Sequence, residues 1–137
     1  MKIINMTQHT ATPEQIEAGV FDPTPVIAQQ IKTLLTFDEI PSPNEMARRA
    51  KLLAVLADEA GADAAMIGGA PFFMSALERT LAGLRVKPLY AFSRRESVEE
   101  VVNGQTVKKS VFKHAGFVEG CAAFVQQEQF FAENAPV

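Results

Sequence analysis

Ala64-Ala65-Met66-Ile67-Gly68-Gly69-Ala70-Pro71 is the stretch that decides the fold of this 137-residue chain. Its first four residues form an apolar run with the length of a buried strand, and its proline stands where helices commonly begin. A helical segment over 71–84 and a second apolar run over 86–92 follow it. Together they make a βαβ unit of about thirty residues, with glycines where the first strand meets the helix. This unit predicts an α/β fold with parallel strands.

Other predicted elements extend this unit toward the N-terminus. Residues 2–6 are predicted to be a first strand, because their apolar run stops at a polar stretch. Thr12-Pro13-Glu14-Gln15 has the pattern of a capping box with proline at the first helical position, so a short helix is expected there. Apolar residues recur with helical spacing over 26–35 and again over 43–60. The chain therefore alternates strands and helices, as a parallel sheet requires.

A hairpin is predicted near the C-terminus. Residues 97–102 and 107–112 alternate loosely and flank Asn103-Gly104, the strongest short hairpin signal. We therefore expect one Rossmann-like α/β domain over 1–137, with a short parallel sheet flanked by helices and an antiparallel edge hairpin. Within it, 94–119 would form the hairpin extension and 120–137 a C-terminal tail or helix.

Ligands of such folds bind beyond the carboxyl ends of the parallel strands. That rule predicts one site made of three loops, Thr7-Gln8-His9-Thr10, Gly68-Gly69-Ala70-Pro71 and Ser93-Arg94-Arg95. Glycines allow close approach to the backbone, and a helix start offers free N–H groups with a partial positive charge. Both suit phosphate, and arginine binds phosphate with paired donors. The alternative is that the glycines only allow tight helix packing.

Positive charge is concentrated in one segment of an acidic chain. The whole chain has a formal net charge of −3, but residues 85–114 hold seven of the 13 Lys and Arg and three of the 16 Asp and Glu. That segment is +4 and the remainder is −7. A local basic region suggests an anionic partner of limited size rather than long nucleic acid. The alternative is an ordinary solvated hairpin whose glutamates pair with Lys108 and Lys109 across the strands.

Several function classes are not supported by the sequence. There is no apolar run long enough for a transmembrane helix, and the N-terminus lacks a signal-peptide pattern, so we expect a cytoplasmic protein without a membrane partner. Cys121 is the single cysteine and has no disulfide partner. Two histidines and one cysteine, widely separated, give no metal-ligand spacing, so neither a metal nor another cofactor is expected.

The histidines are the residues best suited to proton transfer. His9 follows a strand end and His114 lies on the second hairpin strand, and imidazole titrates near neutral pH. The alternative for each is an ordinary exposed position. No nucleophile–base pair or carboxylate pair follows from the spacing. Any chemistry would therefore depend on positioning and charge stabilisation.

The chain resembles a known family in two stretches, residues 1–19 and 64–119. The similar segments are Thr7-Gln8-His9 with Ala11-Thr12-Pro13-Glu14-Gln15, the Gly68-Gly69-Ala70 turn, Pro88-Leu89-Tyr90-Ala91-Phe92-Ser93-Arg94-Arg95, and Asn103-Gly104-Gln105-Thr106-Val107-Lys108-Lys109 followed by Val111-Phe112-Lys113-His114. The resemblance is to the small standalone ring nucleases of type III CRISPR defence, which consist of a CARF-like (CRISPR-associated Rossmann fold) domain.

That resemblance implies a homodimer that binds a cyclic oligoadenylate over its two-fold axis. It also implies metal-independent cleavage, in which a ribose 2′-hydroxyl attacks its own phosphodiester and leaves a 2′,3′-cyclic phosphate. Arg95 and the N–H groups of Gly69 and Ala70 would stabilise charge, and His9 or His114 would assist proton transfer. The other expected ligand contacts are Thr7, Gln8, Thr10, Gly68, Ser93, Arg94 and Lys113.

Three alternatives remain open at this stage. The same pocket would serve a non-catalytic sensor or sponge for a cyclic nucleotide. A small protein-interaction module is a second possibility, with the hairpin and a terminal helix over 122–131 docking a partner chain. The third is a general nucleotide- or sugar-phosphate-binding enzyme.

Overall fold

A single five-stranded sheet organises the chain, in the spatial order β2-β1-β3-β4-β5. The computed structural model describes residues 1–120. β1 pairs in parallel with β2 and β3, β3 pairs in parallel with β4, and β4 pairs antiparallel with β5. The strands are β1 (Ile3–Met6), β2 (Val20–Phe21), β3 (Ala64–Ile67), β4 (Lys87–Val102) and β5 (Gln105–Glu119). The predicted α/β class with an antiparallel C-terminal strand pair is confirmed, whereas the two-residue strand β2 was not predicted.

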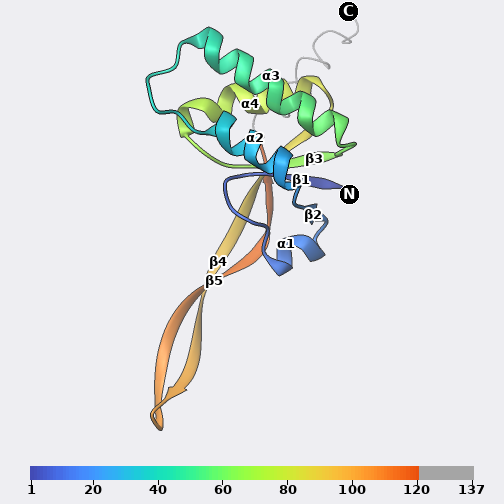
Figure 1. The fold of residues 1–137 in the computed structure, drawn as a ribbon. Helices are drawn as coiled ribbons and strands as arrows, with labels where there is room; N and C mark the ends of the chain where they lie inside the picture. The colour runs from blue at the N-terminus through green and yellow to red at the C-terminus, as the bar shows by residue number, and fades with distance from the viewer. Residues whose placement is uncertain (121–137) are drawn as a thin grey trace, which may run out of the picture.

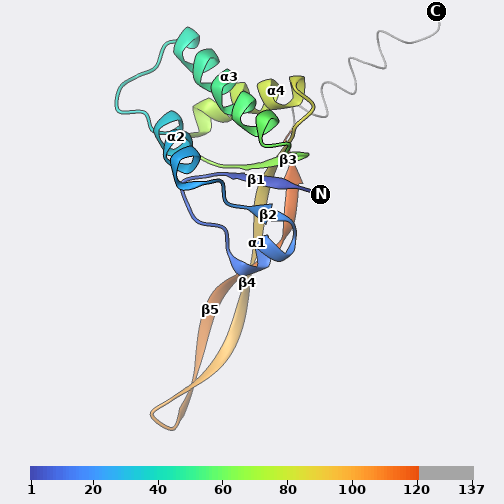
Figure 2. The same cartoon turned by 45° about the vertical axis from the view of Figure 1, so that its right-hand side comes forward.

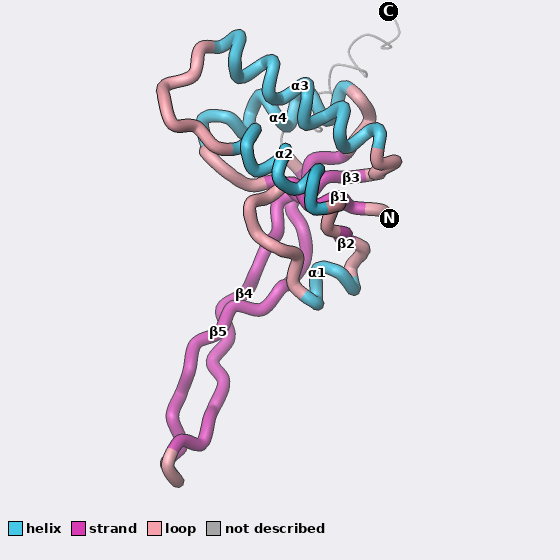
Figure 3. Tube along the Cα trace, in the orientation of Figure 1, coloured by secondary structure: helices cyan, strands magenta, loops and turns pink. Residues whose placement is uncertain are grey.

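In residues 1–120, four helices cover the sheet unequally. They are α1 (Pro13–Glu17), α2 (Pro25–Leu35), α3 (Pro43–Glu59) and α4 (Pro71–Gly83), and each begins with a proline. Figures 1 and 3 show α2, α3 and α4 on one face of the sheet and the short α1 on the other. The capping box of Thr12 and Gln15 is present, and the Ser42 hydroxyl accepts a hydrogen bond from the Glu45 N–H. Local sequence signals therefore set these helix starts.

The core has two parts because successive strand residues point to opposite faces. Ile4 and Met6 of β1 pack with the helices α2, α3 and α4 in the larger cluster, around the fully buried Phe73. Ile3 packs on the opposite face, in a smaller cluster with Val20. β1 and β3 are buried on both faces, as expected for strands with helices on each side of the sheet.

β4 and β5 continue far beyond the rest of the sheet as a two-stranded ribbon (Figure 2). We call residues 93–114 the arm and the remaining described residues the head. The arm starts at a β-bulge in the pairing between Phe92 and Ser93, and it ends in the predicted turn at Asn103-Gly104, where both residues have positive φ. β-bulges bend and twist a ribbon locally, so the bulge marks the point where the arm leaves the head.

One local prediction is wrong. We expected the strand over 86–92 to end before Ser93-Arg94-Arg95, but β4 runs without a break to Val102. The reason is that β5 pairs with β4 along its whole length, so these residues have strand partners where a loop was expected. The predicted hairpin strands, 97–102 and 107–112, are only the outer part of this ribbon.

Within residues 1–120, the structure contains no helix that is both long and apolar enough to span a bilayer. Cys121 and the helix predicted over 122–131 lie outside the described residues.

Candidate functional site

A cavity of about 610 Å³ opens at the carboxyl ends of β1 and β3. It is the crevice in which ligands of open α/β sheets bind. Its lining brings together the segments that follow the two strands, the loop between α2 and α3, and a residue of β4. The lining residues are Thr7, Gln8, His9, Thr10, Thr12, Gln15, Leu35, Thr36, Phe37, Met66, Gly68, Gly69, Ala70 and Ala91. Two of the three predicted loops therefore meet in one cavity.

Asn5 holds the loop that follows β1. Its side chain is buried, and its Nδ2 donates to the backbone oxygen of His9 and to Oδ1 of Asp22, both at 2.7 Å. Its Oδ1 accepts hydrogen bonds from the Thr7 N–H at 3.0 Å and from the Thr7 hydroxyl at 2.8 Å. Since a buried polar side chain is costly unless it is bonded, these four contacts fix the loop conformation.

Sequence reasoning did not single out Asn5 or Asp22. The available signal was an amide in the middle of the apolar run 3–6. Asp22 completes the arrangement from the other side, because its carboxylate also accepts from the Ala11 N–H at 3.1 Å. The segment from Thr7 to Ala11 is thus tied at both ends, and its residues Thr7 to Thr10 line the cavity.

The glycine turn after β3 forms the opposite side of the cavity. Gly69 has φ 152°, a conformation in which side chains are strained, and a Cβ there would contact Met74 and Leu35 at 3.5 and 3.7 Å. Ala70 is the N-cap of α4, and no side chain caps this helix start. Pro71 has no N–H and the Phe73 N–H donates to the Ala70 backbone oxygen at 3.0 Å, so this helix start offers an anion chiefly its partial positive charge.

A third wall comes from the loop between α2 and α3, which the sequence did not predict to be part of the site. Arg49 donates to the backbone oxygen of Thr36 at 2.6 Å, and its guanidinium lies 4.4 Å from the ring centroid of Phe37. Arg49 is itself bonded to Glu45 at 2.8 Å. Hydrogen bonds from Arg48 and Arg49 hold the pKa of the Glu45 carboxyl at about 2. This cluster positions Thr36 and Phe37 at the cavity.

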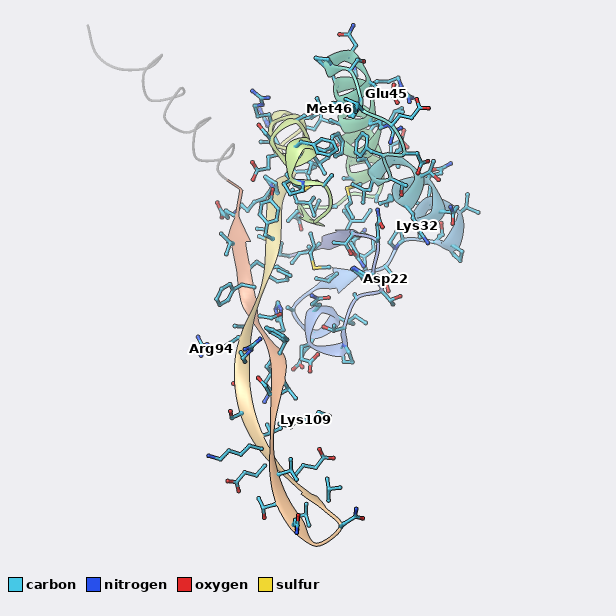
Figure 4. All side chains as sticks on the ribbon, turned by 90° about the vertical axis from the view of Figure 1, so that its left-hand side faces the viewer. Asp22, Lys32, Glu45, Met46, Arg94 and Lys109 are labelled. Carbon is cyan, nitrogen blue, oxygen red and sulfur yellow. The ribbon has the colours of Figure 1, made fainter. Side chains whose placement is uncertain are left out.

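The third predicted loop, Ser93-Arg94-Arg95, lies on the arm and does not line the cavity. Ala91 is the β4 residue at the cavity wall, two residues before the arm begins. In the arm, Ser93 pairs with His114, Arg94 with Lys113, and Arg95 with Phe112. The Arg95 guanidinium lies 5.2 Å from the Phe112 ring centroid. Figure 4 shows Arg94 and Lys109 on the ribbon, away from α2, α3 and α4.

The two histidines have different surroundings. His9 is exposed and lines the cavity. His114 lies at the base of the arm with its ring 4.9 Å, edge to face, from the ring of Phe117. Its Nδ1 is buried and has no hydrogen-bond partner among the described residues. Imidazole groups are thus placed both in the cavity and at the start of the arm.

Among the described residues, the cavity lining is more apolar than polar and carries almost no charge. Hydroxyl, amide and backbone groups supply its polar atoms, and its lining includes no Lys, Arg, Asp or Glu. A second cavity of about 330 Å³ shares the loop Thr7–Thr10 and adds Asp22 and Lys32, both labelled in Figure 4. In the described part of the chain, no group of three His, Cys, Asp or Glu is placed to hold a metal ion.

The sheet order, the crevice at the strand ends and the long terminal ribbon together define a Rossmann-like α/β domain with a β-ribbon arm. Comparison with known families then places the chain. It belongs to the family described as Uncharacterized protein MJ1673 family, whose model matches residues 1–118. No curated protein and no solved structure matches the chain.

Proposed function

We propose that this protein binds a cyclic oligonucleotide of the cyclic oligoadenylate class in the cavity at the carboxyl ends of β1 and β3. The observation that carries the proposal is that two loops far apart in the sequence, Thr7–Thr10 and Gly68–Ala70, form one cavity of about 610 Å³. That volume lies in the range of small-molecule sites. The resemblance to CARF-like ring nucleases motivates the choice of ligand.

The lining chemistry suits a nucleotide unit. The start of α4 at Ala70 has no side-chain cap, and its partial positive charge favours a phosphate. Thr7, Gln8 and Thr10 offer hydroxyl and amide groups for hydrogen bonds to a base edge or a ribose. Phe37 adds aromatic apolar surface to the lining, and its ring also contacts Arg49, Phe72 and Phe73.

A ring of three or more nucleotides is larger than one such cavity, so two copies would share it across a two-fold axis. Homodimers of this kind present the same surface twice, which matches the symmetry of a cyclic oligomer. The proposed ligand therefore requires a homodimer.

Cleavage is the second part of the proposal. The ribose 2′-oxygen would attack the neighbouring phosphorus, the bond from phosphorus to the 5′-oxygen would break, and a 2′,3′-cyclic phosphate and a 5′-hydroxyl would result. His9 lies in the cavity, where it can accept or donate a proton. Arg95 and His114 would act from the base of the arm, His114 through its unpartnered Nδ1.

A non-catalytic sponge with the same cavity is the second candidate function. It is favoured by the position of Arg95 and His114, which pair within the arm and do not line the cavity. Binding would then need only the head, and the ligand would leave unchanged.

Thermal unfolding with and without ligand tests the binding step. Cyclic tri-, tetra- and hexa-adenylate, other cyclic dinucleotides and mononucleotides are added in turn, since a ligand specific for the folded state raises Tm. Ala91→Trp fills the cavity and should abolish the shift, whereas Ser75→Trp, at an exposed position of α4 outside the cavity, should keep it. A shift that survives Ala91→Trp, or no shift with any cyclic oligomer, would reject the proposal.

Chromatography of the same mixtures separates the nuclease from the sponge. A linear product with a 2′,3′-cyclic phosphate end, formed without added metal and slowed by His9→Ala, would establish cleavage. Unchanged ligand after prolonged incubation would establish the sponge.

A further inference from the structure

Within the described residues, both long edges of the arm lack a neighbouring strand. β3 pairs with β4 only from Lys87 to Leu89, so the β3-side edge of β4 lies open along the arm within the described residues. β5 forms the other edge. An isolated two-stranded ribbon is only marginally stable in water, and an open edge is a template for pairing with another chain. Both arguments predict a further strand beside the arm.

The two edges of the arm differ in charge pattern. Along the arm, β5 has Lys108, Lys109 and Lys113 and no acidic residue. A row of lysines is a common protection against strand pairing, because two such edges repel each other. β4 instead has two arginines followed by glutamates, with Arg94-Arg95 near the head and Glu99-Glu100 near the tip. Its edge is therefore the one that can accept a copy of itself.

We propose that two copies of this chain pair antiparallel through the open edges of β4, about a two-fold axis at Ser97. In that register Arg94 of one copy lies opposite Glu100 of the other, and Arg95 lies opposite Glu99. Because the pairing is symmetric, each of these contacts occurs twice, as in any isologous interface. Opposite charges directly across an antiparallel pair are stabilising.

Neighbouring registers that keep the same side chains on each face are worse. A two-fold axis at Glu96 places that residue against its own copy, and an axis at Val98 places Glu96 against Glu100. Both juxtapose carboxylates, which destabilises a strand pair. Only the axis at Ser97 pairs both arginines with glutamates. The charge sequence of β4 thus selects one register.

Apolar side chains support the same register. It places Phe92, which is 50% exposed, opposite Val102, which is 46% exposed. Pairing would join the two ribbons into a four-stranded sheet, which is enough strands for a stable unit. Continuing the register places the partner's Asn103 opposite Ala91, the β4 residue at the cavity wall. Each arm would then end beside the other copy's cavity.

This interface would be the contact surface of the homodimer that the proposed function requires. Its test, however, needs no ligand. Full-length protein with Cys121→Ser is prepared with either Ser97→Cys or Ser110→Cys and oxidised under mild conditions. The two serines pair across the arm and are both exposed. On the proposed axis, two copies of residue 97 are adjacent strand partners, about 5 Å apart at Cα. Two copies of residue 110 are three strand spacings apart, about 14 Å, too far for a disulfide.

We expect disulfide-linked dimers from Ser97→Cys and none from Ser110→Cys. The mass of the uncrosslinked protein is measured by sedimentation over a 100-fold range of concentrations that reaches the millimolar range. A monomeric mass at every concentration would overturn the proposal. Equal crosslinking of both variants would also overturn it. If no such dimer forms but a cyclic oligonucleotide still raises Tm selectively, the interface is rejected and the proposal about the ligand stands.

Charge reversal tests the register independently. R94E/R95E gives an arm with glutamate at four positions, and E99R/E100R gives one with arginine at the same four. We expect each variant alone to dimerise at least about tenfold more weakly, because like charges meet across the axis. An equimolar mixture should form the heterodimer, since all four pairs become complementary. A mixture that associates no better than either variant alone would contradict the register.

Discussion

The head and the arm share one sheet, yet they depend on different interactions. In the head, β1 and β3 are buried on both faces and enclosed by helices. In the arm, nearly every side chain is exposed, and the two strands have only each other. The comparison shows that a strand in this fold need not be stabilised by a core. Packing specifies the head, whereas pairing and charge specify the arm.

A pair of phenylalanine substitutions makes that contrast measurable and has the largest expected effect. Phe73 is fully buried in α4, and Phe112 is 70% exposed on β5. Phe73→Ala should lower the free energy of unfolding by about 3–5 kcal/mol, through lost burial and a cavity. Phe112→Ala should change it by less than about 1 kcal/mol. Urea unfolding of both variants checks this, and similar losses would refute the division into a packed head and a solvated arm.

The hydrogen-bonded loop of the head is the next most sensitive part. Asn5→Ala removes all four side-chain bonds and leaves the Thr7 N–H and the Asp22 carboxylate short of partners. We expect a loss of about 2–3 kcal/mol in urea unfolding, typical of breaking a buried polar network. The cavity loop should also loosen, seen as faster hydrogen exchange at Thr7–Ala11. Thr33→Ala, which removes a single exposed hydrogen bond in α2, is the control and should have little effect.

Local signals explain why the head was largely predictable. The prolines and caps at Thr12 and Ser42 set helix starts by hydrogen bonds within four residues, and the glycine turn at 68–69 divides a strand from a helix. Such rules need no knowledge of distant residues. The Thr7–Thr10 and Gly68–Ala70 loops then meet because parallel strands end at the same edge.

The parts that sequence reasoning missed depend on contacts between distant residues. The Asn5–Asp22 bond spans 17 positions, and Arg49 reaches back 13 positions to Thr36. The length of β4 depends on β5, so a stretch with few apolar residues, Ser93-Arg94-Arg95, is a strand rather than a loop. None of these pairings leaves a periodic pattern that a single sequence displays.

A substitution in the turn at the tip of the arm should have a smaller effect on stability, and that effect should be confined to the arm. Gly104 has φ 76°, and no atom lies within 4 Å of a Cβ built there, so Gly104→Ala costs only backbone strain. Left-handed conformation costs a non-glycine residue about 1 kcal/mol. Arm amides should therefore exchange about fivefold faster, while urea unfolding of the head is unchanged. A matching loss of stability in the head would mean that the arm and the head unfold as one unit.

The smallest expected effect concerns the pH dependence of Tm, compared between an ion pair of the head and one of the arm. The Glu45 carboxyl has its pKa lowered from 4.5 to about 2 by hydrogen bonds to Arg48 and Arg49. A lowered folded-state pKa contributes stability above the unfolded value, and that stability is lost as the pH falls from about 4.5 toward 2. Glu45→Gln should thus flatten the dependence of Tm on pH in this window. Glu96→Gln is the matched arm control, because its carboxylate approaches Lys113 only to 3.9 Å, and its profile should follow the wild type. If Tm of Glu45→Gln falls below pH 4.5 as steeply as that of the wild type, the ion pairs of Glu45 with Arg48 and Arg49 are screened by solvent. Arg49 would then hold Thr36 and Phe37 without the help of Glu45.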